Sequence, residues 1–184
     1  MKNHVRLALL CGCGAAAVVV AFGYPRMIGL PNEKKIAPDS FDQIDPHNPC
    51  GLVCVSVVSR LLDRPSNPAQ SRKIVTCDAL GRTSMAELVD GLGALGFAAF
   101  GARLDQIALK KLDGMPIILH TRGNHFVVIL PMRDGTAVFF DPPHPVRTTT
   151  RSELSQFWDG DAIIVQSDAS QLSKQLKRIG IETQ

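Results

Sequence analysis

Three residues in this chain have the types and the order that a cysteine nucleophile needs. Cys50 begins one apolar stretch, His125 opens a second, and Asp141 closes a third. A thiol attacks as its thiolate, a neighbouring histidine can take up the proton, and a carboxylate can orient the imidazole and stabilise its cation. The pattern therefore predicts nucleophilic attack by Cys50 on a carbonyl carbon.

Cys50 lies where a helix is expected to start. Residues 50–62 are strongly apolar, and Pro49 stands where its missing N–H has no consequence. The unpaired N–H groups and the positive dipole end of a helix N-terminus both favour a thiolate. Gly51 leaves space for an acyl substrate beside the backbone, and Cys54, one turn further, is expected to be a small core residue.

His125 is the expected general base. The Asp134-Gly135 turn predicts a hairpin whose second strand ends in Asp141, and strand pairing would bring Asp141 beside His125. His120, at the end of the preceding strand, is the nearest rival for the role of base. An Asp-Pro pair is also common where a strand ends in a turn, so Asp141 has a purely structural alternative.

The oxyanion hole needs two donors. The backbone N–H of Cys50 supplies one, and a side-chain amide upstream should supply the other. Gln43 and Asn48 are the candidates, and Asn48 is so close to Cys50 that it cannot easily swing across the site. Gln43 is therefore the expected donor, the alternative being an ordinary surface residue.

Composition limits the remaining function classes. The 184 residues include 45% hydrophobic and 20% charged residues, which indicates one globular domain with appendages. The net charge of +3 comes from three basic residues within residues 1–30, because the remaining basic residues equal the 17 acidic ones in number. A neutral body with one Trp and one Tyr excludes a nucleic-acid footprint. No metal or cofactor is expected, because Cys50 and Cys54 lack a second ligand pair.

The first residues are typical of a targeting segment. Lys2 and Arg6 precede the uncharged run Leu7–Tyr24, which predicts a single-pass inner-membrane anchor with the rest of the chain on the periplasmic, extracytoplasmic side. A cleaved signal peptide, which would make the protein secreted, and a lipoprotein are the alternatives. In such an oxidising compartment a Cys54–Cys77 disulfide is an open option.

The chain divides into four parts on these grounds. They are a signal peptide or anchor (1–24), a proline-containing stalk (25–42), a catalytic domain (43–167) and a polar tail with no identifiable partner (168–184). Within the domain, helices come first and short β-branched or aromatic strands follow, which predicts an α+β fold with a mostly antiparallel sheet. The expected helices cover residues 50–62, 84–92, 104–112 and 152–157, with Thr83 as the cap of the second and Ser152 as the cap of the last. An extended piece begins over residues 97–100, and the expected strands cover 116–120, 125–130, 136–140 and 162–165.

Several of these features occur together in one known family. The chain resembles the bacteriocin-processing, double-glycine leader peptidase family of papain-like cysteine peptidases over about residues 40–166. The matching pieces, in order, are Gln43, Cys50-Gly51-Leu52-Val53-Cys54, the helix from Thr83 to Phe97, His125-Phe126-Val127-Val128, Asp141-Pro142 and Trp158-Asp159-Gly160.

The resemblance implies a papain-like fold and four site roles. Cys50 would be the nucleophile, His125 the general base and acid, Asp141 the orienting carboxylate and Gln43 the oxyanion donor. Two departures concern the last role, because Gln43 stands seven residues before Cys50 where the family usually has six, and Pro49 replaces an acidic residue.

The expected function is a cysteine endopeptidase that forms a thioester acyl-enzyme on an extracytoplasmic peptide or protein. A papain-like acyl transferase is a variant of this chemistry, because an amine can replace water. A non-catalytic peptide-binding domain of the same fold is the alternative from another class. The best-known family members are parts of ABC exporters, which makes a separate exporter or a peptide precursor candidate partners, besides the membrane at the N-terminal segment.

Overall fold

The computed structural model describes Ile44 and residues 47–182, which form six helices and six strands. Gln43 and the expected membrane segment Leu7–Tyr24 lie outside these residues. Within the described part, no helix is both long and apolar enough to cross a membrane. The helices are α1 (Cys50–Leu61), α2 (Pro68–Ile74), α3 (Met85–Ala94), α4 (Gln106–Lys111), α5 (Arg151–Phe157) and α6 (Ala169–Arg178). The strands are β1 (Ala98–Arg103), β2 (Ile117–Thr121), β3 (His125–Pro131), β4 (Thr136–Phe140), β5 (Arg147–Thr150) and β6 (Trp158–Gln166).

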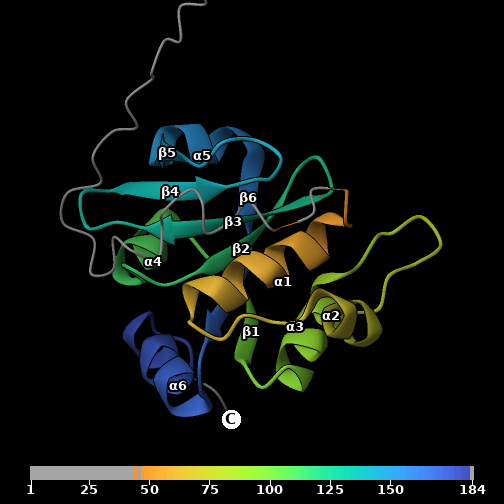
Figure 1. Ribbon diagram of the computed structural model, residues 1–184. Coiled ribbons are helices and arrows are strands. Elements are labelled where there is room, and N and C mark those ends of the chain that lie inside the picture. The colour runs from red at the N-terminus through yellow and green to blue at the C-terminus, as the bar shows by residue number, and fades with distance from the viewer. Residues whose placement is uncertain (1–43, 45–46, 183–184) are drawn as a thin grey trace, which may run out of the picture.

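The strands form one antiparallel sheet in the order β1-β6-β2-β3-β4-β5 (Figure 1). β2, β3 and β4 follow one another as hairpins, and β6 returns from the far end of the chain to lie between β1 and β2. The α+β class and the antiparallel sheet are therefore confirmed.

The central strands are buried on both faces. In β2, Ile118 faces the cluster that contains α1 and α3, whereas its neighbours Ile117 and Leu119 face the cluster that contains α4, α5 and α6. This alternation is the period of two that a pleated strand imposes on its side chains. The sheet consequently separates two apolar layers, and only the α1 layer contains the candidate nucleophile.

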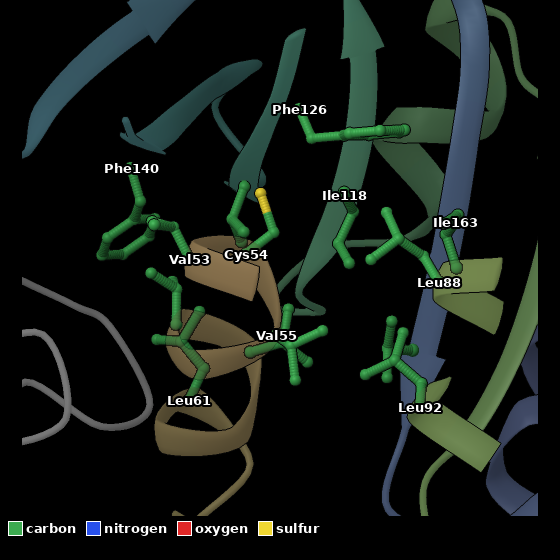
Figure 2. Close-up of a cluster of buried hydrophobic side chains, with 14 of the residues drawn as sticks. Val53, Cys54, Val55, Leu61, Leu88, Leu92, Ile118, Phe126, Phe140 and Ile163 are labelled. Atoms are coloured by element: carbon green, nitrogen blue, oxygen red, sulfur yellow. The ribbon is translucent and has the colours of Figure 1, made fainter. Parts of the chain in front are cut away.

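α1 is apolar around most of its circumference because it is covered from two sides. Figure 2 shows its side chains beside the sheet residues Ile118, Phe126 and Phe140, and Leu88 and Leu92 of α3 complete the same cluster. All five of these side chains are 5% exposed or less. Since burying one such side chain stabilises a fold by about 1.5–3 kcal/mol, this packing holds the first residue of α1 against β3.

Two helices begin with a different cap from the one expected. Ser84, not Thr83, caps α3, and Thr150, not Ser152, caps α5. In both cases a glutamate three residues later completes a capping box by accepting a hydrogen bond from the backbone N–H of the cap residue. Where two hydroxyl residues lie close together, the sequence does not show which one adopts the extended backbone of a cap.

Two short elements were not expected from the sequence. α2 has little apolar periodicity, and its start is marked by Asn67, whose side chain accepts a hydrogen bond from the Ala69 N–H, and by Pro68 at the first helical position. β5 reads Arg-Thr-Thr-Thr and lies at the sheet edge, where only Thr149 is buried. Edge strands and half-exposed helices need little hydrophobic surface, so neither produces a strong sequence pattern.

The segment expected to be a polar tail contains a packed helix. Asp168 caps α6 by accepting from the Gln171 N–H, and Leu172 and Leu176 lie buried against the sheet face opposite α1. Only two apolar residues one turn apart are buried, which explains why the segment looks polar in the sequence. The helix is therefore an integral part of the core.

Leu176→Ala should lower the free energy of unfolding by about 2–5 kcal/mol, because Leu176 is 1% exposed and its removal leaves a cavity. Urea denaturation followed by circular dichroism measures the change. Leu80→Ala is the matched control, since Leu80 is 75% exposed and should change stability little. Equal stabilities of the two variants would show that α6 adds nothing to the fold.

Candidate active site

The three residues singled out by type and order come together in the structure. Cys50 is the first residue of α1, His125 is the first residue of β3, and Asp141 directly follows β4. Pro49 lies outside the helix, and its carbonyl accepts the first intrahelical hydrogen bond, from Val53 at 3.1 Å. The thiol therefore stands at the end of α1 where backbone N–H groups are unpaired.

His125 and Asp141 form a direct hydrogen bond. The distance from Nε2 of His125 to Oδ1 of Asp141 is 2.7 Å, and the side chains are 41% and 22% exposed. β3 and β4 pair with Val128 opposite Phe140, so the residue after β4 falls near the start of β3. The expected contact across the hairpin is confirmed.

His120 does not occupy the position of the base. Its ring makes a 3.1 Å hydrogen bond through Nε2 with Oδ1 of Asn124 and lies 4.9 Å from the ring of Phe126. It therefore belongs to the wall of the site and not to the Cys50–His125–Asp141 set.

The surroundings of Cys50 favour its thiolate. Partial burial raises the pKa of the thiol, but the hydrogen bond and positive charge of His125 and the backbone N–H groups of Phe126 and Gly51 outweigh it, so that the pKa lies below its usual 9.0. The N–H of Phe126 is a contribution that sequence reasoning missed. The only indication of this role in the sequence is that Phe126 directly follows His125.

His125 is correspondingly stabilised as a cation. The hydrogen bond to Cys50 raises its pKa most, burial opposes the change, and the hydrogen bond and charge of Asp141 add to it, giving a pKa of about 9. Because Nε2 is engaged by Asp141, the other ring nitrogen, Nδ1, is the one that faces Cys50. Thiolate and imidazolium thus stabilise each other, as a cysteine nucleophile with its acid–base partner requires.

A comparison with protein families assigns the chain to a family. Residues 41–170 match the model of the peptidase C39 family, which includes all three site residues. The chain belongs to the peptidase C39 family. Membership indicates a cysteine peptidase, and it confirms the resemblance found in the sequence. Most of α6 lies after the matched region.

Two curated relatives of this C39 chain are secretion/processing ATP-binding proteins of Escherichia coli. The colicin V secretion/processing ATP-binding protein CvaB is 29% identical over 119 residues, and the probable microcin-H47 secretion/processing ATP-binding protein MchF is 28% identical over 118. Each alignment covers 63% of this chain but only 16% of the relative. The chain thus matches a small part of these longer proteins.

Solved structures show the same fold. The peptidase domain of Streptococcus ComA, a bifunctional ABC transporter involved in quorum sensing, superposes with a TM-score of 0.59 at 21% identity, covering 68% of this chain and 96% of that one. The double glycine motif protease of an AMS/PCAT transporter, solved with its leader peptide, gives a TM-score of 0.56 at 23% identity, covering 63% and 82%. The papain-like C39 fold is therefore confirmed.

A loop from Cys77 to Ser84 packs against the start of α1 in this C39 domain. A Cβ atom on Gly51 would come within 2.3 Å of Cγ2 of Thr83, and one on Gly81 within 3.2 Å of Cγ of Pro49. The absence of a side chain at Gly51 thus lets Thr83 and Leu88 pack directly against the start of α1. The sequence suggested that this space is left for an acyl substrate, and that expectation is wrong, because Thr83 and Leu88 fill it.

Gln43, the expected second oxyanion donor, lies outside the described residues. Asn48, the weaker candidate, is engaged elsewhere. Its Oδ1 accepts hydrogen bonds from Nε of Arg72 at 3.0 Å and from Nη2 of the same side chain. The assignment to Gln43 remains a prediction.

The three described cysteines are all free thiols. Cys54 is 2% exposed in the core, as expected, and Figure 2 shows it between α1 and the sheet. Burial and the charges of Cys50 and Asp141 raise its pKa well above 9.0. The structure thus contains no bridge between Cys54 and Cys77.

The pKa changes predict how labelling of the C39 site depends on pH. Because the Cys50 pKa is lowered, iodoacetamide should alkylate Cys50 faster than a free thiol at pH 6–7, and the advantage should vanish as pH approaches 9.0. Cys77 is the internal control, since burial and the charges of Glu87 and Asp78 raise its pKa. Peptide mapping by mass spectrometry measures both rates, and equal rates at pH 6 would contradict the prediction.

Proposed function

We propose that this C39 chain cleaves peptide bonds with Cys50 as nucleophile, His125 as general acid and base, and Asp141 as the carboxylate that orients the imidazole. The observation that carries the proposal is the continuous series of contacts from the Cys50 thiol through the His125 ring to Asp141. Asp141 uses Nε2 and therefore sets Nδ1 toward the sulfur, which is the arrangement that both proton transfers need.

The chemistry follows from this geometry. The Cys50 thiolate attacks the carbonyl carbon, and the C=O electron pair moves onto the oxygen. When the tetrahedral intermediate collapses, the C–N bond breaks and His125 donates its proton to the leaving amine, which leaves a thioester on Cys50. Water then attacks the thioester with His125 as base, and the carboxylic acid and the thiolate are released.

The oxyanion is stabilised at the start of α1. The N–H of Cys50 belongs to the first turn of the helix, where backbone donors have no intrahelical acceptor, and the helix dipole places its positive end there. Gln43 is proposed as the second donor on the strength of the family resemblance.

The proposed substrate is a peptide or a small peptide precursor. Proteins similar to this chain are described as a double glycine motif protease bound to a leader peptide and as secretion/processing proteins, which supports a double-glycine leader as the first substrate to test. A separate exporter is a proposed partner. The proposal of an extracytoplasmic substrate depends on the segment Leu7–Tyr24.

A peptide mixture incubated with the wild-type protein and with Cys50→Ala tests the function. New termini that appear only with the wild type identify the cleaved bonds by mass spectrometry. Product analysis with and without an added amine distinguishes an acyl transferase, whose turnover depends on the amine, from a peptidase, which releases the free acid with water alone. Peptides that bind to both proteins and stay intact would instead indicate a non-catalytic binding domain.

A further inference from the structure

A cavity of about 460 Å³ lies beside the candidate active site, on the side of the β2–β3 turn. One wall is the loop before α3 together with the first turn of that helix, and the other is the β2–β3 hairpin. We call it the Glu87 pocket. Its lining residues are Asp78, Arg82, Thr83, Ser84, Met85, Glu87, His120, Asn124 and Phe126.

Both walls of the Glu87 pocket are tied to the catalytic residues. Thr83 packs against Gly51, the residue after the nucleophile, and Phe126 follows His125 and directs its backbone N–H at Cys50. The pocket therefore borders both the residue that follows Cys50 and the residue that follows His125 in the chain, next to where a substrate carbonyl on Cys50 would lie.

The position of the pocket in the sheet indicates which part of the peptide it receives. The leaving amine must stay beside the His125 ring, and Asp141 holds that ring toward β4. The pocket lies on the other side of β3, where His120 of β2 and Asn124 of the turn contribute. It is thus placed to hold a residue of the acyl part, N-terminal to the scissile bond.

The charges of the pocket are unequal. The lining contains two carboxylates, Asp78 and Glu87, and one guanidinium, Arg82. Asp78 pairs with Arg82 at 2.7 Å, so the negative charge of Glu87 is not balanced by Arg82. Oε2 of Glu87 accepts hydrogen bonds from the Ser84 N–H at 2.6 Å and from Oγ1 of Thr83 at 3.4 Å. Among the described residues, Oε1 of Glu87 has no hydrogen-bond partner. The negative field reaches the neighbouring loop, where Glu87 and Asp78 follow burial as causes that raise the Cys77 pKa.

The remaining lining suits an aliphatic chain that ends in a cation. Met85 and Phe126 supply apolar surface, and the His120 ring lies against Phe126 at a centroid distance of 4.9 Å. A lysine or arginine can lay its methylene groups along such a surface while its charged end reaches a carboxylate.

We infer that the Glu87 pocket is a specificity subsite that binds a basic side chain of the substrate, N-terminal to the scissile bond, with Glu87 as the residue that recognises the charge. The inference rests on the proposed function, because it assumes that a peptide lies across Cys50.

Paired peptides test the subsite. Fluorescein-labelled alanine–glycine peptides carry lysine, norleucine or glutamate at successive positions before a central Gly-Ala bond. Cleavage is measured with the wild type. Binding of the same peptides to Cys50→Ala is measured by fluorescence anisotropy. At one of these positions, the lysine peptide should have a kcat/KM and an affinity about three- to five-fold higher than those of the norleucine peptide, which is the gain expected from a partly exposed ion pair. The glutamate peptide should have the lowest values.

Glu87→Gln should bring the ratio of lysine to norleucine close to one, because the carboxylate that attracts the cation is gone while glutamine can still complete the capping box of α3. Glu153→Gln is the matched control, since Glu153 has the same capping role at α5, away from the pocket, and should leave the ratio intact. An unchanged ratio in Glu87→Gln, or no lysine preference in the wild type, would overturn the inference.

The two proposals fail in different ways. Cys50-dependent cleavage without a lysine preference overturns the subsite and leaves the peptidase intact. Glu87-dependent binding of lysine peptides without any cleavage supports the subsite and overturns the peptidase. Absence of both binding and cleavage rejects both.

Discussion

Cys50→Ala should lower kcat/KM for any cleaved peptide by at least about 10³-fold, because the variant lacks the atom that forms the thioester. Peptide affinity should stay close to that of the wild type, since the sulfur contributes little contact area. The measurement is the initial rate on the best substrate from the peptide mixture, with affinity determined separately by anisotropy.

Cys77→Ala is the matched control for this loss. Cys77 packs at the edge of the same apolar cluster as Cys50 and is likewise a free thiol of intermediate exposure. Its pKa is raised, so no thiolate role is expected. If Cys77→Ala lost as much activity as Cys50→Ala, the nucleophile would be misassigned. Residual activity in Cys50→Ala within tenfold of the wild type would reject the thioester mechanism.

His125→Ala should lower kcat about 10³-fold and should also remove the fast alkylation of Cys50 at pH 6. Both effects have one cause, because the imidazolium stabilises the thiolate and donates the proton to the leaving amine. In the wild type, His125 keeps its proton up to its pKa of about 9, so cleavage should fall as pH rises through that value. Stopped-flow alkylation and a pH–rate profile measure the two effects.

His144→Ala is the control for the histidine prediction. His144 lies three residues after Asp141 and is exposed, and only its backbone N–H bonds back to the Asp141 carbonyl, so the substitution keeps that contact. The thermal midpoint of each variant excludes unfolding as a cause. If His125→Ala left the alkylation rate of Cys50 unchanged at pH 6, the ion pair would not exist in solution.

Local sequence patterns predicted much of the fold. The apolar run after Pro49 predicted α1 to within a residue of its end, and the Asp134-Gly135 turn predicted the β3–β4 hairpin. These elements depend on near neighbours in the chain, on helix starts and on turn chemistry, which a sequence displays directly. α2, β5 and the packing of α6 were missed, because each buries few side chains and depends on distant partners.

The sequence by itself determined which groups perform the chemistry and in what order they occur. Cys50 at a helix start, His125 at a strand start and Asp141 at a strand end are local facts. The hairpin turn also predicted that His125 and Asp141 meet, but only the tertiary structure decided that Cys50 joins them, because the burial of α1 against β3 brings it there and no local pattern does. It also decided which distant groups change the pKa of Cys50, such as the N–H of Phe126, and how closely the Cys77–Ser84 loop approaches α1. Electrostatic fields and close packing arise between residues that are distant in the chain and adjacent only after folding.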